Sequence, residues 1–356
     1  MRRLARLRPD DFTLAMLGTV SLSLLLPVHG AGARIVGAMS EIAIGLLFFL
    51  QGARLSRQAI VAGALHWRLH LIVFAATFIV FPLFGLALMP LSGTVLSPPL
   101  YLGLLFLCTL PSTVQASVAF TSIAGGNVPA ALCSASMSSL VGMVLTPLLV
   151  RLLLGAHGGS SLHGLGTIAA QLLLPFLAGQ VARGWIGGWV QRHRVRLGWV
   201  DRISVLLMVY GVFSEATVGG LWRFLTPTNL LVLAVVNAAL LAAMLSCTSF
   251  AARRCGLPRE DEIAIVFCGS KKSLITGIPM ANALFAGQAL GLIVLPLMIF
   301  HQLQLMACAA LARRYAAALP NPAAAPHAAG VSAPLPAAAH APIMSQDAAA
   351  LNRRMA

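Results

Sequence analysis

The segment DEIAIVFCGSKKSLITGIPMANALF, residues 261–285, decides how this chain folds. It is long enough to span a membrane as a helix, and most of its side chains are apolar. Its middle, however, holds Gly269, the polar run from Ser270 to Ser273, and Pro279. Such interruptions at membrane depth are tolerated where freed backbone groups line a cavity, so the segment predicts a broken helix at a binding site.

The same kind of interruption occurs at Pro111–Ser117, within the apolar stretch 100–124. The sequence there, PSTVQAS, again combines proline with hydroxyl and amide side chains. Paired interruptions at corresponding places in two halves of a chain are typical of transporters built from inverted repeats. We therefore expect two broken helices, one in each half, to form the binding site together.

Composition places the chain in a membrane. Of its 356 residues 59% are hydrophobic and only 9% are charged, and the mean hydropathy is +0.89. A water-soluble chain of this length needs far more charge on its surface. The formal net charge of +15 comes from arginines in short loops rather than on one basic face, which argues against nucleic acid as a partner.

Ten apolar stretches are predicted to be transmembrane helices. They are residues 12–28, 35–53, 69–89, 100–124, 131–154, 164–187, 203–222, 229–251, 261–285 and 289–312. With both termini in the cytoplasm, 19 arginines lie on the cytoplasmic side and only three on the other. Ten spans form two five-helix halves, so the second half is predicted to insert upside down. The predicted connections include His29–Arg34, Arg54–Arg68 and Arg183–Arg202.

Two further predictions concern the ends of the chain. The N-terminal arginines and Ala31-Gly32-Ala33 resemble a cleavable signal peptide, but we expect a retained first helix because another span follows Arg34 at once. Residues 316–356 are rich in alanine and proline, which predicts a disordered cytoplasmic tail. Residues 1–315 would form the ten-helix domain in the cell membrane, which in a bacterium is the inner membrane.

The two lysines of the chain are adjacent, Lys271 and Lys272, and both lie inside the ninth predicted span. A charged lysine near the bilayer centre costs ~2.5–3.5 kcal/mol on insertion scales, so a pair points to a functional role rather than to interfacial or ion-paired lysines. On a regular helix Lys272 shares the smaller, more polar face with Gly269 and Thr276. The lysines could bind an anionic substrate, carry a coupling proton, or replace a bound cation.

Further candidate residues for binding a substrate or ion are polar side chains in or beside the interrupted segments and two intramembrane acids. They are Ser112, Thr113, Gln115, Ser117, Asn127, Ser270, Ser273, Thr276, Glu41 and Glu215. The acids could pair with a lysine or relay protons, or they could be solvated at span boundaries. Asn127 follows Gly125-Gly126, a sequence that also fits a helix C-cap with a tight turn.

No motif of an enzyme is present. The sequence has no HExxH, GxSxG or P-loop, and no GxGxxG in a strand–helix context. The six cysteines are scattered and lack metal-ligand spacing. We therefore expect a protein that is not an enzyme and needs no cofactor or metal.

At the interrupted segments the chain resembles the bile acid:sodium symporter superfamily, and more closely its SBF-like branch of bacterial YfeH-type proteins and vertebrate solute carrier family 10 member 7. The resemblance covers about residues 10–315. It rests on residues 41–52 (EIAIGLLFFLQG), 110–117 (LPSTVQAS), 125–127 (GGN), 267–274 (FCGSKKSL) and 277–280 (GIPM).

The resemblance implies a ten-helix fold with two parts. Spans 1, 2, 6 and 7 would form a panel, and spans 3, 4, 5, 8, 9 and 10 a core in which broken spans 4 and 9 cross beside the substrate. Sodium-coupled relatives carry a glutamate and, four residues later, a glutamine as sodium ligands in the ninth span. Those positions hold Phe267 and Lys271 here, which argues against sodium coupling.

We therefore predict a secondary active transporter, symporter-like, that moves a small organic and anionic solute by alternating access. Its partners would be that solute, the lipid bilayer and a coupling ion, for which sodium and a proton both remain open. A regulatory or structural membrane protein is the alternative, and it would tolerate replacement of Lys271 and Lys272. A channel, the third possibility, would not accumulate solute against a gradient.

Overall fold

The chain is described by a computed structural model over residues 11–54, 66–154, 162–220, 225–286 and 288–318. Within these ranges the regular elements are all helical, and the remaining β-type contact is an isolated bridge between Ser92 and Leu96. This confirms the all-helical prediction, which follows because a helix satisfies its backbone polar groups internally. The tail from residue 319 onward and residues 55–65 of the predicted Arg54–Arg68 connection lie outside the described ranges.

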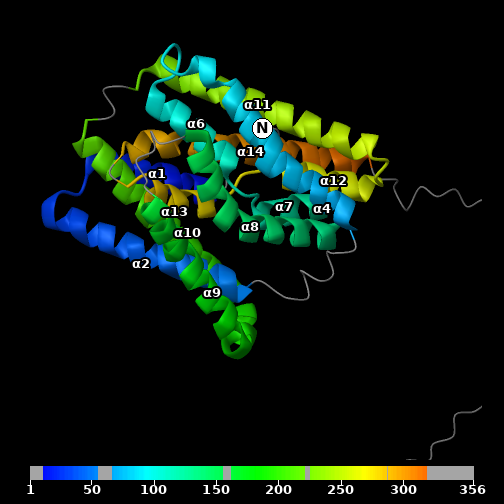
Figure 1. Ribbon diagram of the computed structural model, residues 1–356, viewed down its shortest axis with the longest axis horizontal. Helices are drawn as coiled ribbons and strands as arrows, with labels where there is room; N and C mark the ends of the chain where they lie inside the picture. Colours follow the sequence, from blue (N-terminus) through cyan, green and yellow to red (C-terminus); the bar gives the residue numbers. More distant parts are fainter. Residues whose placement is uncertain (1–10, 55–65, 155–161, 221–224, 287, 319–356) are drawn as a thin grey trace, which may run out of the picture. The chain divides into compact units, whose positions relative to one another are not determined.

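The helices follow the predicted apolar stretches in chain order (Figure 1). They are α1 (Asp11–Leu25), α2 (Gly30–Arg54), α4 (Trp67–Ala75), the π-helical segment η3 (Ala76–Val80), α5 (Phe81–Ala87), the short η4 (Met89–Leu91), α6 (Pro98–Thr109), α7 (Val114–Ile123), α8 (Val128–Leu154), α9 (Leu162–Arg192), α10 (Arg194–Val218), α11 (Pro227–Arg254), α12 (Arg259–Gly269), α13 (Leu274–Leu284) and α14 (Leu290–Ala317). In the described ranges seven helical segments are long and apolar enough to cross a bilayer, and the bent pair α6–α7 makes eight. The chain is a multi-pass membrane protein.

Two of the predicted connections are wrong. Helix α9 continues to Arg192 and α10 begins at Arg194, so most of the predicted loop Arg183–Arg202 is helical. Likewise, α2 begins at Gly30, inside the predicted connection His29–Arg34. The reason is physical: hydropathy marks where side chains become polar, whereas the backbone hydrogen bonds of a helix continue into water.

Four helices, α1, α2, α9 and α10, pack on one another and are called the four-helix group below. Helix α2 lies against α9 (Figure 1), α1 against α10, and α10 also against α2. Glycine makes the α2–α9 contact possible: a Cβ atom at Gly52 would lie 2.1 Å from the carbonyl oxygen of Phe176, and one at Gly179 would lie 2.0 Å from that of Phe49. Backbones can approach this closely only where side chains are absent.

The remaining helices, α4 to α8 and α11 to α14 with η3 and η4, are called the crossing group. Helix α14 packs on α6 and α11, α12 packs on α4, α7, α8 and α11, and α7 packs on α8. Most of the buried apolar core lies here, and α12 and α13 are buried along nearly their whole length. The groups meet where α10 contacts α13 and α14, and where α9 contacts α8 and α13.

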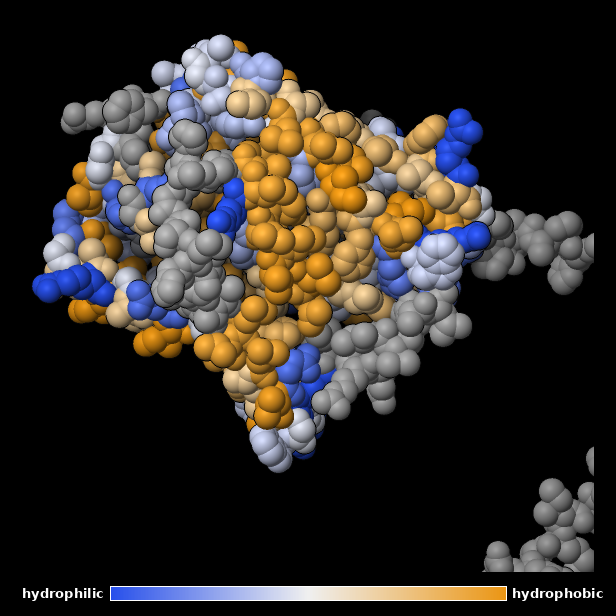
Figure 2. Space-filling view, viewed as in Figure 1, coloured by the Kyte–Doolittle hydropathy of each residue, from blue (hydrophilic) through white to orange (hydrophobic). Residues whose placement is uncertain are grey.

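Large apolar side chains cover much of the outer surface. Figure 2 shows them as a broad band across the visible face, with hydrophilic side chains at its margins. They include Ile42 on α2, Leu152 on α8 and Trp185 on α9, all strongly exposed. Exposed apolar area of this extent indicates contact with lipid rather than with water.

Candidate functional site

The two predicted helix breaks are present, and they touch each other. The first separates α6 from α7, which are bent by 63° at Leu110–Thr113. The second separates α12 from α13 at Ser270–Ser273, the segment that holds both lysines. The backbone amide of Ser273 donates a hydrogen bond of 3.0 Å to the carbonyl of Pro111, which joins the breaks directly.

Hydroxyl groups hold the two broken helices together. The hydroxyl of Ser112 donates to the carbonyl of Cys268 at 2.6 Å, and that of Ser117 donates to the carbonyl of Phe267 at 2.9 Å. Both carbonyls belong to the last turn of α12, where no intrahelical partner is available. Ser112 and Ser117, predicted as binding residues, are thus buried and engaged in joining the helices. The hydroxyl of Ser270, also buried, donates to the carbonyl of Val266 in its own helix.

The ammonium group of Lys272 is fully buried and has a complete set of acceptors. Its Nζ atom donates to the carbonyl oxygens of Thr77 at 2.9 Å, Cys108 at 2.8 Å and Leu110 at 2.6 Å. These carbonyls are available because α6 ends at the break and because Thr77 lies in the π-helical segment. The ring of Phe81 covers the ammonium group at 4.1 Å. Lys272 therefore joins three elements around one buried positive charge.

Lys271 is also fully buried, but it has a different environment. Its Nζ atom donates to one carbonyl, that of Ala116 in α7, at 2.9 Å. It lies 4.2 Å from the ring centroid of Phe120 and 5.0 Å from that of Phe267. Aromatic faces attract a cation through their quadrupole, so two rings replace part of the lost hydration. Phe267 and Lys271, the two positions that depart from the sodium-site pattern, are thus in direct contact.

No carboxylate of the described residues forms an ion pair with either lysine. The ion pairs found among the described residues are Arg54–Asp201 and Arg253–Glu262. The lysines instead lie at the C-terminal ends of α6 and α12, where the helix dipoles favour positive charge. The side chain of Gln304 in α14 fixes the backbone of Lys272. It accepts a hydrogen bond from the Lys272 amide and donates one to the Lys272 carbonyl, both at 2.9 Å. In the sequence, Gln304 is one of two glutamines in an apolar span, which alone does not predict this role.

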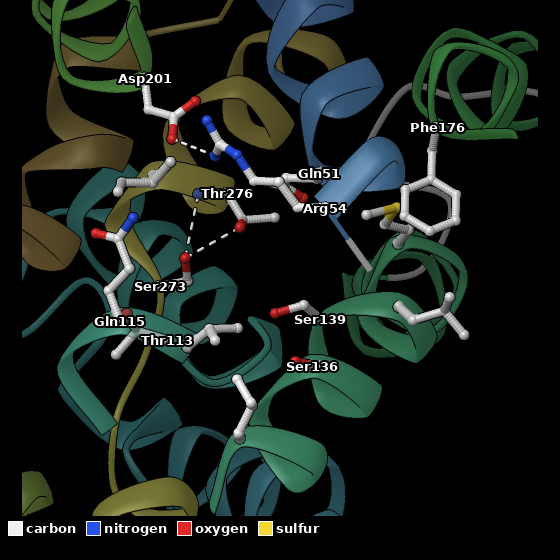
Figure 3. A pocket seen from close by; sticks show the side chains of 15 residues that line it. Gln51, Arg54, Thr113, Gln115, Ser136, Ser139, Phe176, Asp201, Ser273 and Thr276 are labelled. Carbon is white, nitrogen blue, oxygen red and sulfur yellow. Dashed lines mark hydrogen bonds and ion pairs between the residues drawn. The ribbon is translucent and has the colours of Figure 1, made fainter. Parts of the chain in front are cut away.

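A cavity of about 250 Å³ lies beside the breaks, between the four-helix group and the crossing group (Figure 3). It includes the predicted residues Thr113, Gln115, Ser273 and Thr276. Its further lining residues are Gln51, Arg54, Val114, Leu132, Ser136, Ser139, Leu140, Met143, Phe176, Asp201 and Ile275. Lys271 and Lys272 do not line it, and both side chains are fully buried elsewhere. The segment Ser270–Ser273 is not helical, so the faces of a regular helix do not predict where these two side chains point.

The remaining predicted residues lie away from this cavity. Asn127 donates to Asp261 at 2.7 Å and accepts from the amide of Ala130 at 3.0 Å, so its side chain caps α8. Glu41 and Glu215 are exposed and line a second cavity of about 780 Å³ together with Arg34. The structure thus places both acids at one cavity, but neither forms an ion pair with a lysine within the described part of the chain.

Arg54 and Asp201 are site residues that hydropathy and charge patterns do not identify. Their ion pair joins α2 to α10 across 147 positions and projects into the cavity (Figure 3). Both residues fall at predicted span ends, where charged side chains are ordinarily solvated. The one available signal was that Asp201 is an acid in an arginine-rich connection.

Comparison with known proteins decides the family. The model of the SBF-like CPA transporter family matches residues 10–317. This chain belongs to that family. An uncharacterized protein from Pseudomonas aeruginosa is 59% identical over 87% of this chain and 94% of its own length. YfeH of Escherichia coli is 52% identical over 86% and 92%.

A vertebrate relative extends the relationship. Sodium/bile acid cotransporter 7 of Rattus norvegicus is 31% identical over 86% of this chain and 92% of its own length. The predicted resemblance is therefore confirmed: this SBF-like chain is a membrane transporter of the bile acid:sodium symporter family. The family implies transport rather than catalysis.

Proposed function

We propose that this SBF-like protein is a secondary active transporter that moves a small organic, anionic solute by alternating access. In this proposal ten spans form two inverted five-helix repeats, with both termini in the cytoplasm of a bacterial cell. The four-helix group would be the panel and the crossing group the core. The relative named sodium/bile acid cotransporter 7 supports transport coupled to a second species.

The observation that carries the proposal is the position of the cavity beside two joined helix breaks. Its walls come from both groups: Arg54 and Asp201 from the four-helix group, and Thr113 and Ser273 from the crossing group. If the two groups moved relative to each other, the shape of a cavity between them would change more than the shape of a site inside one group. Broken helices at membrane depth also expose backbone groups that a solute can use.

The second cavity supports access from both sides. It has walls from α2 and α10, like the first, but it uses Glu41 and Glu215 in place of Arg54 and Asp201. Glu41 and Arg54 are thirteen positions apart in α2, and Asp201 and Glu215 are fourteen positions apart in α10. Each separation corresponds to about 20 Å along the helix axis, so the cavities lie near opposite ends of the same two helices. Alternating access needs two approaches of this kind along one interface.

The lysines support a proposal about coupling. Lys271 and Lys272 hold two positive charges at the joined breaks, and carbonyl groups surround Lys272 much as they would surround a bound cation. We propose that these fixed charges replace sodium at the crossing and favour an anionic solute in the adjacent cavity. Sodium would then not be required, and a proton would be the coupling ion.

The test is solute uptake by purified full-length protein in liposomes, with a panel of small organic acids and an inward proton gradient. Wild-type protein should accumulate at least one solute above its external concentration. The double variant K271M/K272M should lose accumulation, whereas Arg253→Gln, at an ion pair away from the cavity, should retain it. Absence of flux for every solute favours a regulatory or structural protein, and flux without accumulation indicates a channel.

A further inference from the structure

Within the described part of the chain, three buried polar atoms of the cavity wall have no hydrogen-bond partner. They are Oε1 of Gln51, Nη2 of Arg54 and Oδ1 of Asp201, and all three side chains line the cavity between the groups. Asp201 is 2% exposed, so bulk solvent does not hydrate its carboxylate as it would at the protein surface. Buried polar atoms are nearly always hydrogen-bonded, and three unpartnered atoms in one cavity point to a ligand that would satisfy them.

The chemistry of the three atoms is specific. Arg54 and Asp201 already bond through Nη1 and Oδ2, which holds the two side chains in place and leaves one donor and one acceptor free. Figure 3 shows both groups directed into the same space, with Gln51 beside Arg54. The site thus offers a guanidinium N–H for an anion and, next to it, two acceptor oxygens for donor groups.

Other lining residues restrict the size and polarity of the ligand. The cavity measures about 250 Å³, and Leu140, Met143 and Phe176 give it an apolar side. On the crossing group, the hydroxyls of Ser273 and Thr276 bond to each other at 3.0 Å, so they are partly satisfied without a ligand. Among the described residues, the buried unpartnered atoms of the cavity wall therefore lie on the four-helix group, and we place the polar end of a small solute beside them.

We propose that Gln51, Arg54 and Asp201 form a subsite for a small carboxylate that carries a hydroxyl or ammonium group on the neighbouring carbon. Arg54 Nη2 donates to the carboxylate, and Asp201 Oδ1 and Gln51 Oε1 accept from the hydroxyl or ammonium group. The inference rests on the proposed function, because it names the substrate class of the same cavity. It differs from simple anion binding, for which the two acceptor oxygens would be unfavourable.

The experiment measures binding to full-length protein in nanodiscs, using the shift in thermal unfolding midpoint during titration. The probes are potassium lactate, alanine, potassium propionate and 1,2-propanediol, which differ by one functional group at nearly constant size. Lactate and alanine should bind at least about tenfold more tightly than propionate, because a site built around hydrogen bonds rejects an analogue that lacks them. Propanediol, which has no carboxylate, should not bind.

Variants assign the effect to the subsite. Asp201→Asn should reduce the preference for lactate over propionate to less than about threefold, since an amide can turn its N–H toward the ligand. Arg54→Gln should abolish binding of every carboxylate. Because that variant leaves Asp201 buried without its partner, the double variant R54Q/D201N serves as a second test with no unpaired charge. Arg253→Gln is the matched control and should bind like wild type.

Three results would overturn the assignment: equal affinity for lactate and propionate, an unchanged preference in Asp201→Asn, or no binding by any of the probes. The readout requires no transport, so failure of this proposal is distinct from failure of the proposed function. Binding without flux would support the subsite and contradict transport. Accumulation of solutes that lack the donor group would support transport and contradict the subsite.

Discussion

The two adjacent lysines should differ in what they contribute to stability, although both are fully buried. Replacing Lys272 by methionine removes three hydrogen bonds and one aromatic contact, whereas replacing Lys271 removes one hydrogen bond and two aromatic contacts. The cost of burying an ammonium group is common to both, so it cancels in the comparison. The difference between the variants is therefore set by the contacts alone.

The magnitude follows from those contacts. Two extra hydrogen bonds from a charged donor contribute about 3–6 kcal/mol, at about 1.5–3 kcal/mol each. Lys271 contacts one more aromatic ring than Lys272, and this contact offsets about 1–2 kcal/mol of that difference. K272M should thus be less stable than K271M by about 1–5 kcal/mol.

The assay is reversible unfolding of each full-length variant in mixed micelles, followed by circular dichroism as denaturing detergent increases. Methionine keeps the unbranched shape of lysine, which limits cavity formation as a separate cause. K271M is itself the matched control, since it lies next in sequence and is equally buried. If K271M proved as destabilising as K272M, or more so, the carbonyl cage would not be what stabilises the break.

Two further predictions concern other contacts. Gly52→Ala should lower stability by about 1–3 kcal/mol because its Cβ would meet the backbone of Phe176, whereas Gly45→Ala, with no atom within 4 Å, should be neutral or stabilising in the same unfolding assay. A Gly52→Ala protein as stable as Gly45→Ala would contradict the close α2–α9 contact. Asn127→Ala should lower stability by about 1–2 kcal/mol through loss of the α8 cap while solute affinity stays unchanged. If Asn127→Ala instead greatly reduced solute affinity at normal stability, Asn127 would belong to the binding site.

Much of the fold could be predicted because its causes are local. Length and apolarity predict the helices, and Pro111 and the polar run Ser270–Ser273 predict both breaks, since each removes or competes for backbone hydrogen bonds. The tight turn at Gly125 is confirmed too, with a positive φ of 71° that favours glycine. Each of these sequence signals determines the backbone conformation within a few residues of its own position.

The site was less predictable because its contacts are distant and partly made by the backbone. The acceptors around Lys272 are carbonyl groups, which every residue has, so Thr77 and Cys108 carry no sign of this role in the sequence. The π-helical segment Ala76–Val80 is likewise ordinary in composition. The pairing of Arg54 with Asp201 depends on how α2 packs against α10, and polarity alone placed both residues at solvated ends.

In our proposal, fixed lysine charges replace sodium in this member of the family. This replacement is tested most directly by the initial rate of solute uptake into liposomes under an inward proton gradient, with sodium or choline as the external cation. Wild-type protein should give equal rates in the two cations, and K271M/K272M should lose uptake. Uptake that requires sodium and survives the double replacement would contradict it.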